Sequence, residues 1–247
     1  MPIRSKILHW YFPTTKKMVR AYIAKKHGGL WKNKEFWMSI FIGAVILAIG
    51  FDASILAREH LKSALHAQWG PDIFLDFLPV LGLKDFLVWG LELLIVFFIG
   101  ILFFNPEYIP FSLKSVGLLY LIRSFFIILT PLGTRPDQFV ETTKGLFYNL
   151  AYNSNDFFFS GHVSFPFMLA LIFWGLPAIR WTMFMVAAFF AAAVLLAHTH
   201  YSIDVFAVPL IVPTIFQVGR HFFRDDVRFI ESRRHLHISG DEYPSHL

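Results

Sequence analysis

The side chains best suited to chemistry in this sequence are His200 and Asp204, which are four positions apart. On a helix this spacing places both on one face, so the carboxylate can hold one imidazole nitrogen while the other nitrogen points away. Such a pair combines a nucleophile or base with the group that orients it. A lone His–Asp pair is also a common polar contact, so the neighbouring residues decide its meaning.

A second histidine, His162, directly follows Ser160 and Gly161. Free N–H groups and the positive dipole end at a helix start bind anions such as phosphate. Two histidines, one oriented by a carboxylate and one beside an anion site, suit phosphoryl transfer. Ordinary helix capping by Ser160 is the simpler alternative for this part of the pattern.

The run His198–Thr199–His200 with Asp204 could instead supply metal ligands. No further acidic ligand lies near this run, and the chain contains no cysteine, which removes thiolate ligands and thiol nucleophiles. We therefore expect no metal ion and no other cofactor. His198 is interpreted as a neighbour that shapes the site.

The elements that must position these residues are membrane-spanning helices. Hydrophobic residues make up 56% of the 247 residues and charged residues 16%, whereas soluble domains carry about 25% charged residues. Apolar runs near the length of a span, about 20 residues, occupy 36–56, 86–104, 112–129, 162–176, 178–197 and 202–218. Trp69–Leu83 is apolar but interrupted by glycine and proline, a pattern that predicts an interfacial helix.

We therefore predict an all-α, polytopic integral membrane protein with six transmembrane helices and an interfacial helix between the first two spans. The expected parts are a basic amphipathic arm (1–35), a six-span catalytic membrane domain (36–219) and a polar tail (220–247). Pro131–Asp156 is the most polar internal stretch and is predicted to be a long loop.

Lysine and arginine near the span ends predict the orientation. Six spans put both termini on one face, and the basic arm and the arginines of the tail predict that this face is cytoplasmic. Lys114 and Arg180 would lie on the same side. The start of the fourth span and the junction of the fifth and sixth then face the exoplasmic, lumenal or periplasmic side.

Ionisable residues within the spans fall on that second side. Asp52, Glu92 and Arg123 lie in the outer halves of their spans, at the level of the histidines. Because such groups are costly at membrane depth and usually face a cavity or a partner, their convergence predicts a functional site. A purely structural pairing of Arg123 with Glu92 or Asp52 is an equally good interpretation.

Two segments, 159–162 and 196–205, resemble the signature segments of the sphingomyelin synthase family, which is related to the type 2 phosphatidic acid phosphatases. Segments 71–76 and 121–124 resemble others of that family in the same order. The resemblance implies six spans and an exoplasmic or lumenal site. It also implies that His200 is the nucleophile aided by Asp204, that His162 handles the proton of the leaving or accepting hydroxyl, and that a phosphohistidine forms.

The sequence departs from the phosphatases at two places. They carry a lysine, six intervening residues and Arg-Pro; here Arg135–Pro136 is present, but Ile128 takes the lysine position. They also carry Ser-Arg where this chain has Ala193–Val194. Both departures favour the synthase branch. The candidate substrate and phosphate ligands are Arg123, Ser160, Gly161, His198 and Arg135.

The expected function is transfer of a phospho-head group from a glycerophospholipid to ceramide or diacylglycerol. A lipid phosphatase or phospholipase C-like hydrolase, using water as acceptor, is the alternative. A non-catalytic lipid-binding membrane protein is a further one. The expected partners are these lipids and the bilayer, not nucleic acid, because anionic head groups account for the net charge of +5.

Overall fold

In the computed structural model the described residues are 29–63, 69–133, 135 and 158–239. Most of the predicted basic arm and of the predicted long loop lie outside these ranges.

The described residues form helices and connecting segments, with no strand among them. In chain order they are η1 (Leu30–Lys32), α2 (Lys34–Ser63), α3 (Ile73–Asp76), α4 (Lys84–Phe104), η2 (Pro106–Tyr108), α5 (Ile109–Leu129), α7 (Gly161–Ile172), α8 (Pro177–Leu196), α9 (Ser202–Phe206), α10 (Val208–Phe222) and α11 (Arg224–Ser239). Five apolar helical segments within these ranges are long enough to cross a membrane: Lys34–His60, Asp85–Phe104, Pro106–Leu129, Pro177–Leu196 and Ser202–Phe222. The predicted all-α, polytopic architecture is confirmed.

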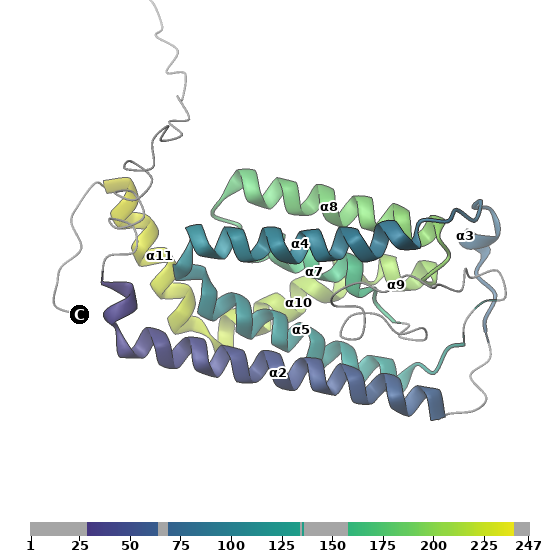
Figure 1. Cartoon of the computed structure of the whole chain (residues 1–247), viewed down its shortest axis with the longest axis horizontal. Coiled ribbons are helices and arrows are strands. Elements are labelled where there is room, and N and C mark those ends of the chain that lie inside the picture. The colour runs from purple at the N-terminus through teal and green to yellow at the C-terminus, as the bar shows by residue number, and fades with distance from the viewer. Residues whose placement is uncertain (1–28, 64–68, 134, 136–157, 240–247) are drawn as a thin grey trace, which may run out of the picture.

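The long helices lie side by side along one axis (Figure 1), with α2 at one edge and α8 at the opposite edge. α11 closes one end of the bundle, and α3 and α9 lie at the other. The start of α4 and the short helix α9 therefore lie toward the end farthest from α11, whereas α7 lies inside the bundle.

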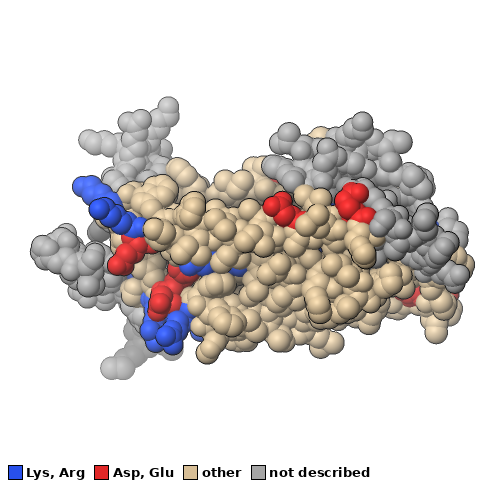
Figure 2. All heavy atoms as spheres, turned by 90° about the horizontal axis from the view of Figure 1, so that it is seen from below, with Lys and Arg blue, Asp and Glu red and all other residues tan. Residues whose placement is uncertain are grey.

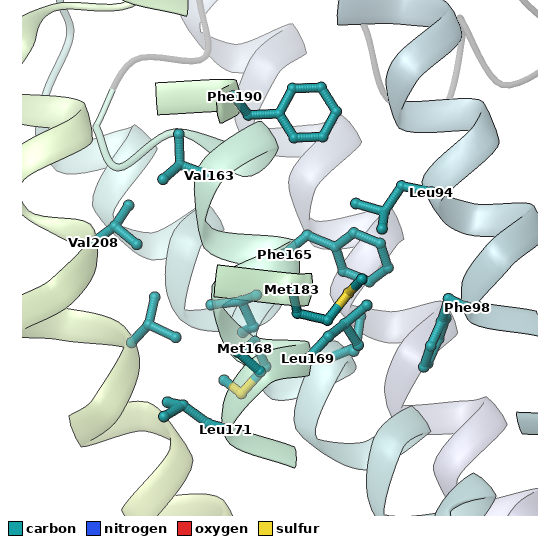
Figure 3. Close-up of a cluster of buried hydrophobic side chains, with 14 of the residues drawn as sticks. Leu94, Phe98, Val163, Phe165, Met168, Leu169, Leu171, Met183, Phe190 and Val208 are labelled. Atoms are coloured by element: carbon teal, nitrogen blue, oxygen red, sulfur yellow. The ribbon is translucent and has the colours of Figure 1, made fainter. Parts of the chain in front are cut away.

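The fourth apolar run of the sequence forms α7, which has 12 residues and is about 18 Å long at 1.5 Å per residue. Ten of its residues are buried. Figure 3 shows Phe165, Met168 and Leu169 of this helix among side chains of α4, α8 and α10. Because neighbouring protein replaces lipid around it, this helix can begin below the membrane surface.

The prediction of an interfacial helix over Trp69–Leu83 is wrong in the length of the helix, because only the four residues Ile73–Asp76 are helical. Gly70 and Pro71 precede this turn, and Pro79 and Gly82 follow it. These residues disfavour a continuous helix. The segment instead forms one helical turn flanked by irregular chain.

The packing of α2 against α5 depends on glycine. A Cβ atom placed on Gly117 would lie 2.7 Å from the carbonyl carbon of Ile46 and from the amide nitrogen of Leu47. Small residues let helix backbones approach closely within a membrane, where apolar burial provides no driving force. Beside this contact the hydroxyls of Ser54 and Ser124 are hydrogen-bonded at 2.9 Å.

The end of the bundle that carries α11 is the charged end, whereas the flank seen in Figure 2 is mostly uncharged. There Lys114 of α5 donates to Asp226 of α11 at 2.6 Å and to the hydroxyl of Ser39 in α2 at 2.7 Å. Ser39 donates to the other carboxylate oxygen at 2.6 Å. This buried network joins three helices.

Candidate active site

His200 and Asp204 meet at the start of α9. His200 Nδ1 lies 3.2 Å from Asp204 Oδ2, and both side chains are buried. His200 precedes the helix, so the contact does not come from two residues on one helical face, as the spacing suggested. Instead Asp204, in the first turn, folds back and its Oδ2 accepts the N–H of Tyr201 at 3.1 Å. A carboxylate in a first turn is also favoured by the helix dipole.

This arrangement favours one tautomer of the imidazole. An ionised carboxylate only accepts hydrogen bonds, so the contact with Asp204 suits the tautomer of His200 that carries its proton on Nδ1. The Nε2 nitrogen then carries the lone pair. His200 is therefore arranged as a nucleophile or base.

Asp204 also holds the segment that precedes α7. Its Oδ1 accepts the N–H of Phe158 at 3.0 Å, and its main-chain carbonyl accepts the N–H of Ser160 at 3.0 Å. The bond between Phe158 and Asp204 joins residues that are 46 positions apart in the sequence. The two bonds bring the start of α7 to His200, so that the rings of His162 and His200 have centroids 6.4 Å apart.

His162 lies in the first turn of α7 and packs edge-on against Phe190 of α8, with ring centroids 5.8 Å apart. The first backbone hydrogen bond of this helix joins the N–H of Ser164 to the carbonyl of Ser160 at 2.9 Å. The amides of 161–163 precede that bond and belong to the group that a helix cannot satisfy internally. An anion placed there would meet N–H groups and the positive dipole end.

Arg123 of α5 brings a positive charge to the same place. Its side chain is buried, and its Nε donates to the carbonyl of Phe159 at 3.0 Å. A Cβ atom on Gly161 would lie 3.6 Å from the guanidinium carbon. The guanidinium therefore lies directly against the start of α7.

Ser160 occupies the N-cap position of α7, but its side chain makes no capping hydrogen bond. Its Oγ is buried and has no hydrogen-bond partner among the residues that the structure describes. Ordinary capping therefore does not account for this serine. Together with Arg123 and the amides of α7 it can form a phosphate-binding site.

The backbone at both edges of the site is strained. Within the described ranges, the non-glycine residues with positive φ are Phe158 (82°), Phe159 (30°) and His198 (50°). Such conformations cost on the order of 1–3 kcal/mol each and cluster at functional sites. Here Asp204 binds the amide of Phe158, and Arg123 binds the carbonyl of Phe159.

The remaining sequence-predicted residues are placed differently. His198 is buried in the turn between α8 and α9. Arg135 forms an ion pair with Asp76 at 2.8 Å and lies over the ring of Trp69 at 5.9 Å, so it is held beside α3. Asp52 has an exposed side chain on α2; the expectation that it joins the buried cluster is wrong.

Two residues missed as site components connect this end of the bundle. Asp72 Oδ2 accepts the N–H of Ser202 at 2.6 Å. The hydroxyl of Tyr201 donates to the carbonyl of Gly133 at 2.8 Å and accepts the N–H of Gly70 at 3.2 Å. An aspartate before an apolar helical turn is a recognisable cap; the long-range bonds of Tyr201 have no comparable signal in the sequence.

The surroundings of these two residues shift their pKa values in opposite directions. Burial raises the pKa of Asp72, but hydrogen bonds from Ser202, Leu75 and Phe74 outweigh it, so the pKa lies below its usual value. Burial raises the pKa of the Tyr201 phenol. At neutral pH Asp72 is therefore an anion and Tyr201 a neutral hydroxyl.

Within the described ranges, no group of three or more histidine, cysteine, aspartate or glutamate side chains is placed to hold a metal ion. The metal-ligand interpretation of His198, His200 and Asp204 therefore has no geometric support.

In a comparison with known families, residues 153–222 match the family model described as PAP2 superfamily C-terminal. No curated protein and no solved structure matched the chain. The matched segment contains α7, α8, α9 and α10, and with them His162, His200 and Asp204. Members of this superfamily are phosphatases and phosphotransferases that act on lipids, so at that general level the protein is an enzyme.

Proposed function

With residues 153–222 related to the PAP2 superfamily, we propose that this protein is a membrane lipid phosphotransferase of the sphingomyelin synthase type. It moves a phospho-head group from a glycerophospholipid to the hydroxyl of ceramide or diacylglycerol. The observation that carries the proposal is the buried His200–Asp204 pair, with the ring of His162 6.4 Å away at the start of α7.

In the first half-reaction, the phosphate diester of the donor lies against Arg123 and the amides of α7, which stabilise the charge that develops on its oxygens. His200 Nε2 attacks phosphorus, and the bond from phosphorus to the diacylglycerol oxygen breaks. His162 protonates that oxygen as general acid. Asp204 stabilises the cationic imidazole, and the product is a phosphohistidine with its head group attached.

In the second half-reaction, His162, now neutral, accepts the proton of the acceptor hydroxyl. The hydroxyl oxygen attacks phosphorus, and the bond to His200 Nε2 breaks. Attacking and leaving groups lie roughly in line in phosphoryl transfer, so the two histidines work from opposite sides of phosphorus. The donor becomes diacylglycerol, and the acceptor becomes the new phospholipid.

Two features support a lipid acceptor over water. The positions at which the phosphatases carry cationic clamp residues are apolar here: Ile128 is exposed on α5, and Val194 is buried in α8. His162 and His200 are also buried, which limits access of bulk water to phosphorus. Both features favour an acceptor delivered from the bilayer.

The test uses purified protein in bilayer discs with head-group-labelled phosphatidylcholine or phosphatidylethanolamine, with and without ceramide or diacylglycerol. Label in a new lipid that requires the added acceptor supports transfer. Label only in water-soluble product would replace the proposal with hydrolysis. No turnover over the whole panel, with the protein folded, would favour a non-catalytic lipid-binding protein. His200→Ala is the matched inactive control.

We also propose that the site faces the exoplasmic or lumenal side and that both termini are cytoplasmic. Lys114, Arg180 and the arginines of α11 support this orientation, because they lie at the end of the bundle opposite the histidines. Positive residues concentrate on the cytoplasmic side of membrane proteins.

A further inference from the structure

We infer that Asp72 is a positioning residue, whose carboxylate fixes the start of α9 so that Asp204 meets His200 in the reactive geometry. The inference rests on the proposed function and adds a residue to the machinery of that site.

The carboxylate of Asp72 serves two helices at once. Its Oδ1 accepts the N–H groups of Phe74 and Leu75, each at 3.1 Å, and so caps α3. Its Oδ2 accepts the N–H of Ser202, the first residue of α9, at 2.6 Å. The side chain is buried, and charge-assisted bonds of this kind are stronger than those between neutral groups.

Two consecutive backbone N–H groups at the start of α9 each donate a hydrogen bond to a different carboxylate. Asp204 binds the N–H of Tyr201, and Asp72 binds the next one, that of Ser202. His200 is the residue before this pair. A change at Ser202 therefore moves the Asp204 side chain relative to the imidazole, and small displacements of this kind cost up to about 100-fold in rate.

Leu75 anchors α3 in the core, but the rest of the α3 segment packs incompletely against α9. A groove of about 650 Å³ lies between them, lined by 70–74, Phe77, Leu132 and 201–203. Ile73 and Phe77 of the α3 segment are 78% and 84% exposed. Three contacts tie the two segments together: the edge contact of Phe74 with Phe206, the bond from Gly70 N–H to the Tyr201 hydroxyl, and the bond from Ser202 to Asp72. Of these, the bond to Asp72 is the one made by a charged side chain.

The kinetic test compares Asp72→Ala and Asp72→Asn with wild type in the lipid transfer assay. The alanine variant should lose about 10- to 100-fold in kcat, with KM for the donor within about twofold, because Asp72 is assigned no substrate contact. Asparagine keeps one acceptor oxygen and should be intermediate. Asp225→Asn, which changes an exposed carboxylate of α11, should match wild type.

A double-mutant cycle separates positioning from a general structural role. If Asp72 acts by placing Asp204, then Asp72→Asn should cost less than about twofold in the Asp204→Asn background, because coupled residues are not additive. Full additivity of the two losses would overturn the inference.

Hydrogen exchange gives a measurement that does not need activity. Asp72→Ala should speed exchange of the amides of 201–204 and leave those in the middle of α10 unchanged. Unchanged exchange at 201–204, or unchanged kcat in an active protein, overturns the inference alone. A wild type inactive over the lipid panel would instead remove the proposed function, while exchange still tests the link from Asp72 to α9.

Discussion

His200 and Asp204 differ in what their loss removes. His200→Ala should abolish turnover and the phosphoenzyme, because the nucleophile is gone. Asp204→Asn should leave a small residual rate, on the order of 10⁴-fold below wild type, as removal of an orienting carboxylate does in the serine protease triad. Rapid-quench trapping of labelled protein measures both effects. A phosphoenzyme that persists in His200→Ala would show that the two histidines have been assigned in reverse.

For His162 we expect a dependence on the leaving group. His162→Ala should lose most activity with a natural phospholipid, whose alkoxide must be protonated as it leaves. The loss should be much smaller with a p-nitrophenyl phosphodiester, because general acid catalysis matters little for a leaving group that is already stable as an anion. The ratio of kcat/KM values for the two donors is the measurement. Equal losses with both donors would contradict the assignment.

The sequence predicted His162, His200 and Asp204 as candidate site residues, but neither Asp72 nor the geometry that joins these residues. The spacing of His200 and Asp204 pointed to the right pair for a reason that does not hold, since only Asp204 is helical. The contact of Asp204 with Phe158 and that of Asp72 with Ser202 depend on how distant segments meet. Local patterns carry no information on such contacts.

At the scale of elements, the start of α11 is held by the largely buried pair of Lys114 and Asp226. Asp226→Asn leaves the lysine charge buried without its counter-charge, and should lower the free energy of unfolding by roughly 3 kcal/mol. Asp225 is its neighbour, with a side chain 89% exposed against 11% for Asp226. Asp225→Asn should change stability by less than about 0.5 kcal/mol. Unfolding in mixed micelles compares the two, and equal stability would refute a structural role for this pair.

The spans were predictable because hydropathy marks each long apolar helix. What hydropathy cannot separate is a helix that faces lipid from one that faces protein, since both are apolar. α7 is of the second kind, and its 12 residues replaced an expected span of 162–176. The length of α3 was overestimated, because the apolar composition of Trp69–Leu83 predicted a longer helix than the glycines and prolines of that segment permit.

For the whole molecule, the orientation can be tested with single cysteines, because the chain contains none. Asp76→Cys lies at the site end and Asp225→Cys at the α11 end, and both native side chains are exposed. In sealed vesicles that keep the native orientation, a membrane-impermeant maleimide should label Asp76→Cys and spare Asp225→Cys until the membrane is opened. The reverse pattern would invert the proposed topology.

The strained turn at Phe158 and Phe159 also bears on the order of synthesis. Arg123, which binds the carbonyl of Phe159, precedes the turn in the chain, whereas Asp204, which binds the amide of Phe158, is 46 residues beyond it. The turn therefore lacks one of its two partners while the ribosome has produced only α7 and α8. The surroundings of His162 are therefore complete only after the segment that carries Asp204 has been made and has packed against the start of α7.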